Sequence, residues 1–432
     1  MKRTIVVLTG IIILLAAGLI GILIFMNNQP APTRGVEPIV EVQAMEPDSS
    51  IWGQNFPNQY STLLLTETNN NPTTFGGSKQ VSKLEQDPRL VTLFAGYPFS
   101  IDYNEDRGHM NSLTDVRATK RINEKTPGTC YSCKSSNNPG LWDEMGMVDY
   151  DKTPFAELGE QIEEPIGCAN CHEAGTMRLI VTNPAFEEAL AAQGLDWTTF
   201  TRQEMRTAVC GNCHVEYYFK GDGKYLTFPW EDGRKIEDIS AYYQEIGFKD
   251  WDHAESGAPM IKMQHPEFEL FTNESTHYKA GVACADCHMP YTRDGAAKFS
   301  NHNVQSPLLN AEAACGQCHT DVAYVTGRVA TIQAQVNQTM LATEDAILAA
   351  IESIKAASAT ANVDTRRLDE ARNLHREAQL RWDFIAAENS MGFHNPEEAL
   401  RILAASTDLA RQAQIKAIQA AGTPAVIQTG SQ

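Results

Sequence analysis

The sequence is short of positive charge. Lys and Arg number 35 against 54 Asp and Glu, which gives the 432 residues a formal net charge of −19. Binding of nucleic acid phosphates needs a cationic surface, so this balance argues against a nucleic acid partner. The hydrophobic share of 42% and the charged share of 21% are typical of a globular protein, and they exclude a disordered or fibrous chain.

Cysteine is also scarce, because ten residues in 432 are too few for a disulfide scaffold. The cysteines are nevertheless not scattered. They form five C-x-x-C pairs, with none left over: Cys130/Cys133, Cys168/Cys171, Cys210/Cys213, Cys284/Cys287 and Cys315/Cys318.

Long strands are not expected either, because no alternation of apolar and polar residues extends over any length. Residues 51–320 are irregular, with short helical patterns at 185–193 and at 201–209, the second of which runs into Cys210. From 328 to 391 there is neither Gly nor Pro, and apolar residues such as Ile347, Ile351 and Ile354 recur at helical spacing. We expect two long helices joined by a turn near 358–367, and a third helix from 397 to about 421.

The N-terminus contains the longest apolar run, residues 5–26, in which only Thr9 is polar. Its 22 residues are enough to span a bilayer, and no convincing cleavage site follows, so we expect an uncleaved anchor, with a removed signal peptide as the alternative. Lys2 and Arg3 would stay cytoplasmic and the body would lie outside. The expected organisation is an anchor or signal at 1–26, a proline-containing tether at 27–50, a cofactor-binding catalytic region at 51–320 and a long-helix region at 321–432.

Four of the cysteine pairs continue into histidine, as CANCH, CGNCH, CADCH and CGQCH, which end at His172, His214, His288 and His319. C-x-x-C-H is the attachment motif of c-type haem, in which two thiols bond to the porphyrin and the imidazole binds the iron. Zinc is the first alternative, but it pairs C-x-x-C units about 15–20 residues apart, and these begin at least 31 residues apart. Redox dithiols are the second, and five in one chain do not fit that pattern.

The fifth pair reads CYSCK and ends at Lys134. We interpret it as a haem whose axial ligand is the Lys134 amine; a degenerate motif without haem is the alternative. An amine must lose its proton to bind iron and lacks the π system of imidazole. The Lys134 iron would therefore differ from the other four, which suggests that chemistry occurs there.

The histidine count fits four haems with two imidazole ligands each. Seven histidines remain beyond the four in the motifs, and the count does not say which of them are ligands: His109, His253, His265, His277, His302, His375 and His394.

One CxxCK and four CxxCH motifs in this order resemble the pentahaem, ammonia-forming cytochrome c nitrite reductases, the cytochrome c552 family. Five further segments carry the resemblance, which covers about residues 50–415: GYPFSIDYNEDRGH at 96–109, CHVEYYF at 213–219, PMIKMQHPE at 259–267, CHMP at 287–290 and RWDFIAAENSMGFHNPEEALRIL at 381–403. The resemblance implies a mainly α multihaem cytochrome c with an irregular haem-packed body, long C-terminal helices and little β structure.

The resemblance also implies roles for single residues. Lys134 is the ligand of the active-site haem, and the distal ligands are His109 for the CGNCH haem, His277 for CGQCH, His302 for CANCH and His394 for CADCH. The pocket residues are Arg121, with Arg117 as a nearby competitor, Tyr217 and His265. One Ca²⁺ is expected on Glu216, on the backbone carbonyls of Tyr217 and Lys262, and on the side-chain oxygen of Gln264, all of them hard oxygen donors. His253 and His375 remain ordinary solvated or packed histidines.

The implied function is six-electron reduction of nitrite to ammonium, with five haem c groups and one Ca²⁺. A non-catalytic electron-transfer cytochrome is one alternative, and reduction of hydroxylamine or sulfite at the same haem is another. The expected location is periplasmic, with a membrane-bound tetrahaem quinol-oxidising cytochrome or another cytochrome as electron donor and a homodimer formed through the long helices. The sequence does not identify the donor.

Overall fold

The structure is a computed structural model that describes residue 18 and residues 38–105 and 107–422. The chain divides into two compact units, Met1–Glu41 and Val42–Gln432, and the second is described below. Within the described residues, no helix combines the length and the apolar character that crossing a bilayer requires. The predicted anchor at 5–26 lies outside the described residues except for residue 18.

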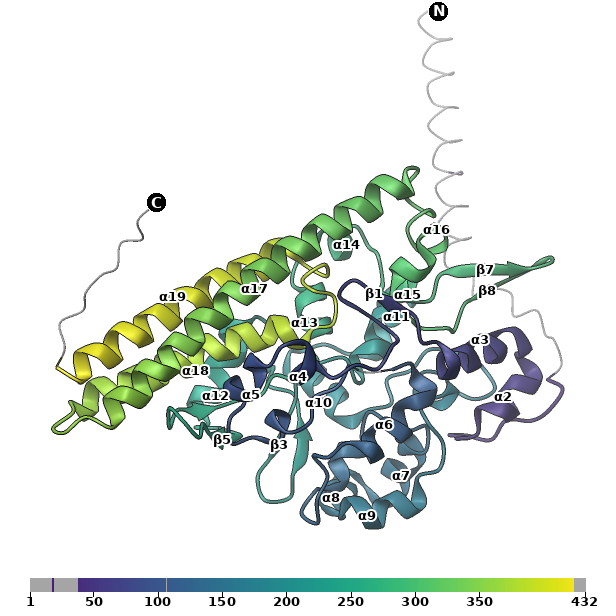
Figure 1. Cartoon of the computed structure of the whole chain (residues 1–432). Helices are drawn as coiled ribbons and strands as arrows, with labels where there is room; N and C mark the ends of the chain where they lie inside the picture. The colour runs from purple at the N-terminus through teal and green to yellow at the C-terminus, as the bar shows by residue number, and fades with distance from the viewer. Residues whose placement is uncertain (1–17, 19–37, 106, 423–432) are drawn as a thin grey trace, which may run out of the picture. The chain divides into compact units, whose positions relative to one another are not determined.

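The first part of the body consists of short helices joined by irregular segments (Figure 1). The α-helices here are α2 (Ser49–Asn55), α3 (Pro57–Thr68), α4 (Lys83–Gln86), α5 (Arg89–Leu93), α6 (Ser112–Ala118), α7 (Asn138–Met145), α8 (Met147–Lys152) and α9 (Phe155–Leu158). Five 3-10 turns accompany them: η1 (Pro98–Ser100), η2 (His109–Asn111), η3 (Gly128–Tyr131), η4 (Gly159–Gln161) and η5 (Cys168–Asn170). Short elements are what the Gly- and Pro-rich sequence predicts.

The second part follows the same pattern. Its α-helices are α10 (Pro184–Ala192), α11 (Arg202–Gly211), α12 (Ile236–Glu245), α13 (Glu267–Thr272), α14 (Thr276–Lys279), α15 (Cys284–His288) and α16 (Ala311–Ala314), with the 3-10 turns η6 (Trp197–Thr199) and η7 (Pro307–Asn310). Helix α11 begins with a capping box, in which Thr201 Oγ1 accepts from Glu204 N and Glu204 Oε2 accepts from Thr201 N. Helix α11 contains Cys210, as the sequence predicted.

Strands are few and short among the described residues. Eight of them form four separate antiparallel hairpins: β1 (Pro72–Thr73) with β2 (Gly76–Gly77), β3 (Tyr218–Lys220) with β4 (Tyr225–Thr227), β5 (Trp251–Asp252) with β6 (Pro259–Met260), and β7 (Tyr291–Asp294) with β8 (Ala297–Ser300). The mainly α fold with little β structure is therefore confirmed.

The C-terminal part contains three long helices that run side by side (Figure 1): α17 (Val322–Ser358), α18 (Thr365–Ala387) and α19 (Pro396–Ala420). Asp321 caps α17 by accepting from Tyr324 N, and Asp364 caps α18 by accepting from Arg367 N. The break between α17 and α18 coincides with the predicted turn. Ile347, Ile351 and Ile354 are fully buried, as their helical spacing predicted.

The long helices share a hydrophobic core with the irregular body. Leu93, Phe94 and Trp251 from the body lie in one cluster with Ile347 of α17 and Trp382 of α18. A second cluster lies entirely within the irregular part, around Tyr150, Phe186 and Trp230. Because the first core extends to β6, the segment that follows, residues 261–267, is held on a rigid base.

Candidate active site and haem-binding residues

The C-x-x-C-H motifs fold as single helical turns. The histidine N–H donates to the carbonyl of the first cysteine in three of them, at 3.0 Å for His172, 2.9 Å for His214 and 2.9 Å for His319, and the fourth is helix α15 itself. One turn of helix places residues four apart on the same face, so both thiols and the imidazole can reach one flat group. None of the ten cysteines forms a disulfide.

Cys318 departs from the setting of the other nine cysteines. Those nine are partly buried, whereas Cys318 is exposed, and so is His319 beside it. The physical reason is position: the CGQCH turn lies between α16, which has only four residues, and the first turn of α17, so few segments cover it. Haem attachment at Cys318 stays a prediction.

The motifs also lie close to one another. The thiols of Cys133 and Cys213 are within hydrogen-bonding contact, and so are those of Cys210 and Cys284. The CYSCK segment thus adjoins CGNCH, which in turn adjoins CADCH. Cys287 is near enough to Cys315 for that thiol to raise the Cys287 pKa, although burial contributes more.

Three motif histidines each face a histidine that is distant in sequence. The ring centres are 6.3 Å apart for His172 and His302, 6.2 Å for His288 and His394, and 6.4 Å for His319 and His277. Two imidazoles that bind one metal ion from opposite sides, at about 2 Å from each nitrogen, have ring centres about 6 Å apart. The structure therefore brings together three of the four implied ligand pairs at a spacing that fits an iron between them.

The ring nitrogens of four of these histidines support the same interpretation. In each ring Nδ1 contacts an oxygen of the protein at 2.8 to 3.0 Å: His172 with Met177 O, His288 with Gln305 O, His302 with Ser300 O, and His394 with Glu388 Oε2. Such a contact fixes the tautomer and leaves the Nε2 lone pair for a metal. The residues present therefore fit haem.

The fourth implied pair, His214 with His109, has a different arrangement. His109 lies near His214 and Lys134: burial lowers its pKa to about 4, and the charges of both residues act in the same direction. The imidazole ring next to His214 is that of His265 and not that of His109. The centres of the His214 and His265 rings are 6.4 Å apart and their planes are at 73°. His109 stays the predicted distal ligand, on proximity alone.

Arg121 and Tyr217 both lie near the CYSCK thiols. The Arg121 guanidinium lies over the Phe99 ring, 4.0 Å from its centre. Burial raises the pKa of Tyr217 well above its usual value, Cys133 and Cys130 add to this, and the positive charge of Arg121 opposes it. Asp102 holds the Arg121 segment by accepting from Thr119 Oγ1 at 2.8 Å and from Lys120 N at 2.9 Å, and Thr119 Oγ1 accepts from Arg121 Nε at 3.1 Å.

Arg117, the competing arginine, is engaged elsewhere. Its Nη2 donates to the carbonyl oxygens of Ile162 at 2.6 Å and Gly159 at 3.1 Å, and its Nε donates to the Tyr131 hydroxyl at 3.3 Å. The Arg117 guanidinium thus stabilises a neighbouring loop.

The residues of the implied calcium site are close together. Glu216 is fully buried; its Oε2 accepts from Gln264 N at 2.6 Å and its Oε1 from the Tyr243 hydroxyl at 2.9 Å. Gln264 Nε2 donates to the Lys262 carbonyl at 3.0 Å. Burial raises the pKa of Glu216 well above its usual value, and the nearby Glu269 adds to this. Within the described residues, no three Cys, His, Asp or Glu side chains group into a metal site, and the implied calcium site contains only one acid.

The two unassigned histidines are packed residues. His253 Nε2 contacts Thr92 O at 2.8 Å while its Nδ1 accepts from Glu255 N and Ser256 N. His375 contacts Ser256 through Nδ1 and Gln379 through Nε2, both at 3.0 Å. With both ring nitrogens engaged and both side chains buried, neither is left to bind iron.

Comparison with known proteins agrees with this geometry. The family model for cytochrome c552 matches residues 48–431. The chain belongs to the cytochrome c552 family. The cytochrome c-552 of Bacteroides fragilis is 41% identical over 384 residues, which cover 87% of this chain and 78% of that one. The cytochrome c-552 of Maridesulfovibrio salexigens is 34% identical over 442 residues, with 96% and 85% covered.

A solved structure has the same fold as this cytochrome c552. It is the cytochrome c nitrite reductase of Desulfovibrio desulfuricans, whose catalytic subunit is described as having two calcium sites. The TM-score is 0.83 at 34% identity, and the match covers 88% of this chain and 87% of that one. The family resemblance drawn from the motifs is confirmed.

Sequence reasoning overlooked two carboxylates of this site. Glu267 lies between His214 and His265, and Glu388 accepts from His394. Both stand in segments that were quoted for the resemblance, PMIKMQHPE and RWDFIAAENSMGFHNP. Each carboxylate is close in sequence to a candidate histidine. Glu267 comes two residues after His265, and Glu388 comes six residues before His394. This proximity could have identified both as partners of those histidines.

Proposed function

We propose that this cytochrome c552 reduces nitrite to ammonium, NO2⁻ + 6e⁻ + 8H⁺ → NH4⁺ + 2H2O, at the CYSCK segment. The observation that carries the proposal is that Arg121 lies near enough to Tyr217 and to the Cys130 thiol for its positive charge to lower the pKa of both groups. A cationic guanidinium and a partly buried phenol beside the single lysine-type motif provide an anion-binding, proton-donating pocket. An electron-transfer protein has no need of one.

Five haem c groups would be attached at the five cysteine pairs, and they would supply the six electrons one at a time. Lys134 would bind the active-site haem. The four histidine-ligated haems would take His172 with His302, His214 with His109, His288 with His394, and His319 with His277. The thiol contacts support an electron path from CADCH through CGNCH to CYSCK.

The pocket residues would each have a distinct task. The Arg121 guanidinium binds and orients the nitrite anion and stabilises negative charge as the N–O bonds break. Burial raises the pKa of Tyr217, so its Oη holds a proton at neutral pH and can donate it. His265 supplies protons through its imidazole. All three side chains are partly buried, which strengthens these electrostatic interactions.

We assign one Ca²⁺ to Glu216, the carbonyls of Tyr217 and Lys262, and the side-chain oxygen of Gln264. Support comes from the buried Glu216 carboxylate, because a divalent cation would stabilise its charged form, and from the hydrogen bonds that already join Gln264 to Glu216 and to Lys262. The Desulfovibrio protein, with its two calcium sites, is consistent with this assignment. In a chain of net charge −19, Ca²⁺ and Arg121 would give the anion a locally positive approach.

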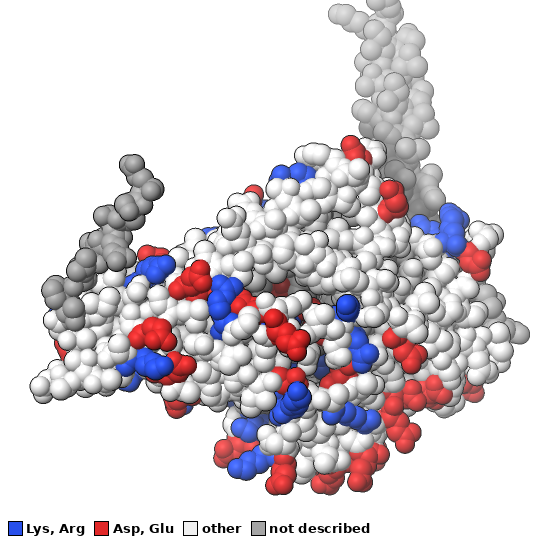
Figure 2. All heavy atoms as spheres, in the orientation of Figure 1, with Lys and Arg blue, Asp and Glu red and all other residues white. Residues whose placement is uncertain are grey.

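The cellular setting is a proposal from the sequence. The apolar run at 5–26 supports an extracytoplasmic, membrane-anchored protein that receives electrons from a membrane-bound tetrahaem quinol-oxidising cytochrome. The haem-binding region at 51–320 and the long-helix region at 321–432 would then have separate roles, catalysis and assembly. A homodimer through the long helices is supported by α17, where Arg328 is the single charged residue from 322 to 343 while Tyr324 is 66% exposed. The ridge of α17 is largely uncharged in Figure 2.

The deciding experiment is an optical spectrum of the full holoprotein with and without nitrite or cyanide. A high-spin component that shifts on ligand addition, five haems per chain and nitrite-dependent oxidation of a reduced dye are expected. A wholly low-spin spectrum that no ligand changes would mean an electron-transfer cytochrome instead.

A further inference from the structure

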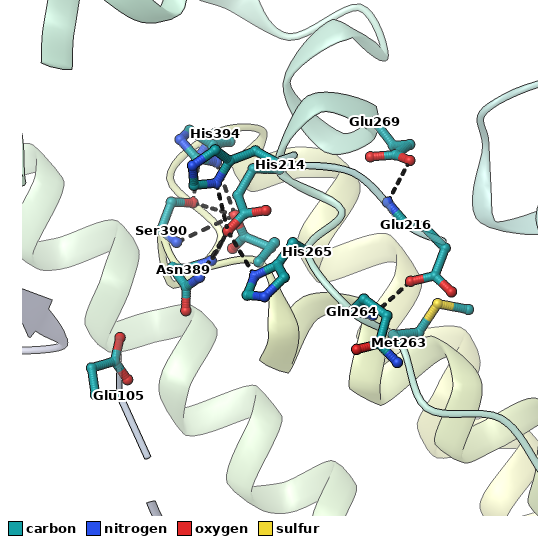
Figure 3. A network of polar contacts seen from close by, with 12 residues as sticks. Glu105, His214, Glu216, Met263, Gln264, His265, Glu269, Asn389, Ser390 and His394 are labelled. Carbon is teal, nitrogen blue, oxygen red and sulfur yellow. Dashed lines mark hydrogen bonds and ion pairs between the residues drawn. The ribbon is translucent and has the colours of Figure 1, made fainter. Parts of the chain in front are cut away.

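One carboxylate oxygen lies near two histidines with different proposed roles, one in haem binding and one in the nitrite pocket. Glu267 Oε1 lies 3.7 Å from Nδ1 of His214, in the CGNCH motif, and 3.8 Å from Nδ1 of His265, in the proposed nitrite pocket. The rings of His214 and His265 come from different segments and lie near one another, with centres 6.4 Å apart (Figure 3). These separations exceed hydrogen-bond length, so the carboxylate acts on both rings through its charge.

The carboxylate itself is held in place. Asn389 Nδ2 donates to Glu267 Oε1 at 2.7 Å, and Glu267 is only 8% exposed at the start of α13. Two backbone hydrogen bonds fix the neighbouring chain: Phe268 N donates to His214 O at 3.0 Å, and Glu267 N to His265 O at 2.9 Å. The acceptor cannot turn toward one ring without leaving its anchor on Asn389.

A negative charge at Nδ1 has the same consequence for both rings. It keeps the proton on Nδ1 and turns the lone pair of Nε2 away from the carboxylate. For His214 that nitrogen is the one available to iron, and an anionic partner makes the imidazole a stronger donor. For His265 the same contact sets which nitrogen faces the pocket.

Glu388, the residue before Asn389, offers a comparison with Glu267. Glu388 Oε2 contacts His394 Nδ1 at 3.0 Å and accepts from Ser390 Oγ at 2.6 Å, so it serves one histidine where Glu267 serves two. Glu388 and Asn389 are consecutive, and the short segment after α18 therefore supports the ligands of two motifs at once.

We propose that Glu267 is a shared positioning residue, whose single oxygen orients both the iron-binding imidazole of His214 and the pocket imidazole of His265. The part that concerns His265 rests on the proposed function. The electron-delivering haem next to the active site and the proton-donating side chain within it would then be adjusted by one charge, so that neither can be altered alone.

The test uses the full-length holoprotein with Glu267→Gln, which removes the charge and keeps the shape. We expect five haems per chain, and an upward shift in the midpoint potential of one low-spin haem, because loss of a nearby negative charge favours the reduced iron. We also expect cyanide binding at the high-spin haem to slow and kcat for nitrite to fall, each by about tenfold, the lower range for loss of such a supporting carboxylate. Redox titration followed by electron paramagnetic resonance resolves the individual haems.

Two control variants make the result specific. Glu388→Gln should shift the potential of a different low-spin haem, that of His394. Glu344→Gln replaces a buried carboxylate on α17 that contacts Arg89 and Trp382, and it should shift no haem potential. If Glu267→Gln does not yield holoprotein, Asn389→Ala, which frees the carboxylate from its anchor, should change the same haem and the cyanide rate in the same directions.

Each other outcome contradicts the proposal. A changed potential with unchanged cyanide binding would make Glu267 a partner of His214 alone, and the reverse would make it a partner of His265 alone. If neither Glu267→Gln nor Asn389→Ala changes the haem potential or the cyanide binding, Glu267 does not position either histidine. A parent protein that binds cyanide but does not reduce nitrite would refute the proposed function, whereas the potential and cyanide measurements would still decide the shared role.

Discussion

Arg206 and Asp286 form an ion pair of 2.7 Å that joins two haem-attachment motifs. Arg206 lies on α11, four residues before Cys210, and Asp286 lies between Cys284 and Cys287 on α15. The arginine side chain is 7% exposed and also donates to the Tyr291 hydroxyl at 2.9 Å. The pair therefore fixes the relative positions of the motifs whose thiols touch.

Replacing this arginine tests that role. Arg206→Met should lower the free energy of unfolding of the holoprotein by about 2 kcal/mol, because a buried pair loses one partner while Asp286 remains partly exposed. Thermal unfolding measures the change. Lys152→Ala breaks the pair of Lys152 with Asp149, where both side chains are more than half exposed, and should cost almost nothing. Equal losses in the two variants would show that the interior pair has no special weight.

The proposed role of Lys134 as a haem ligand has its own test. Lys134→His creates a fifth C-x-x-C-H motif, so five haems should remain attached. Imidazole would replace the amine as ligand and change the potential of that iron. Nitrite reduction should fall by at least about tenfold, which is a barrier change of only ~1.4 kcal/mol. The assay is steady-state oxidation of a reduced dye. A variant with five haems and the parent rate would show that Lys134 does not tune the site.

The two neighbouring arginines provide a matched pair of variants. Arg121→Gln should reduce kcat/KM for nitrite by about 100-fold, because it removes the cation that stabilises developing charge in the pocket. Arg117→Gln removes hydrogen bonds to Ile162 and Gly159, so it should lower stability by about 1–2 kcal/mol with kcat/KM nearly intact. Kinetics and thermal unfolding on both proteins separate the roles. If Arg117→Gln shows the kinetic loss, the assignment is reversed.

A buried acid predicts a pH dependence of stability. Glu344 is 1% exposed; burial raises its pKa to about 8, Asp87 adds to this and Arg89 opposes it. Between the ordinary value of 4.5 and about 8, the folded state keeps the proton and the unfolded state releases it. Raising the pH through this window therefore favours unfolding, on the order of 1 kcal/mol per pH unit.

Glu344→Gln has no proton to lose and should show a smaller fall in melting temperature between pH 5.5 and pH 8 than the parent. Glu269, whose pKa burial also raises to about 8, is present in both proteins and cancels in the comparison. Parallel pH profiles for parent and variant would mean that Glu344 is ionised throughout.

The apolar N-terminus makes a prediction about location. If residues 5–26 span the membrane uncleaved, the protein should stay with membranes through a high-salt wash, because apolar burial is insensitive to ionic screening. Mass spectrometry of the mature chain should then find the N-terminus upstream of residue 26. A mature chain that begins beyond residue 26, released by the wash, would identify a signal peptide.

The attachment motifs and the helical architecture followed from local patterns of residues. Thiol attachment is a local reaction, so C-x-x-C-H and C-x-x-C-K could be recognised without a fold, and the absence of Gly and Pro from 328 to 391 was enough to predict α17 and α18 with their turn. Helix formation depends on residues within one or two turns, which sequence patterns report directly.

Which side chains meet and which stay exposed depends on how distant segments fold together. His172 faces His302 across 130 positions of sequence. Arg121 acts on Tyr217 through its charge while Arg117 donates to Ile162 O, although both arginines are in the same short stretch. Cys318 belongs to a motif of the same form as the others, yet it alone among the cysteines is exposed. Glu267 acquires its two partners only when α13 packs against the end of the CGNCH segment. Contacts and exposures of this kind depend on how distant segments pack, and no local pattern of residues encodes that packing.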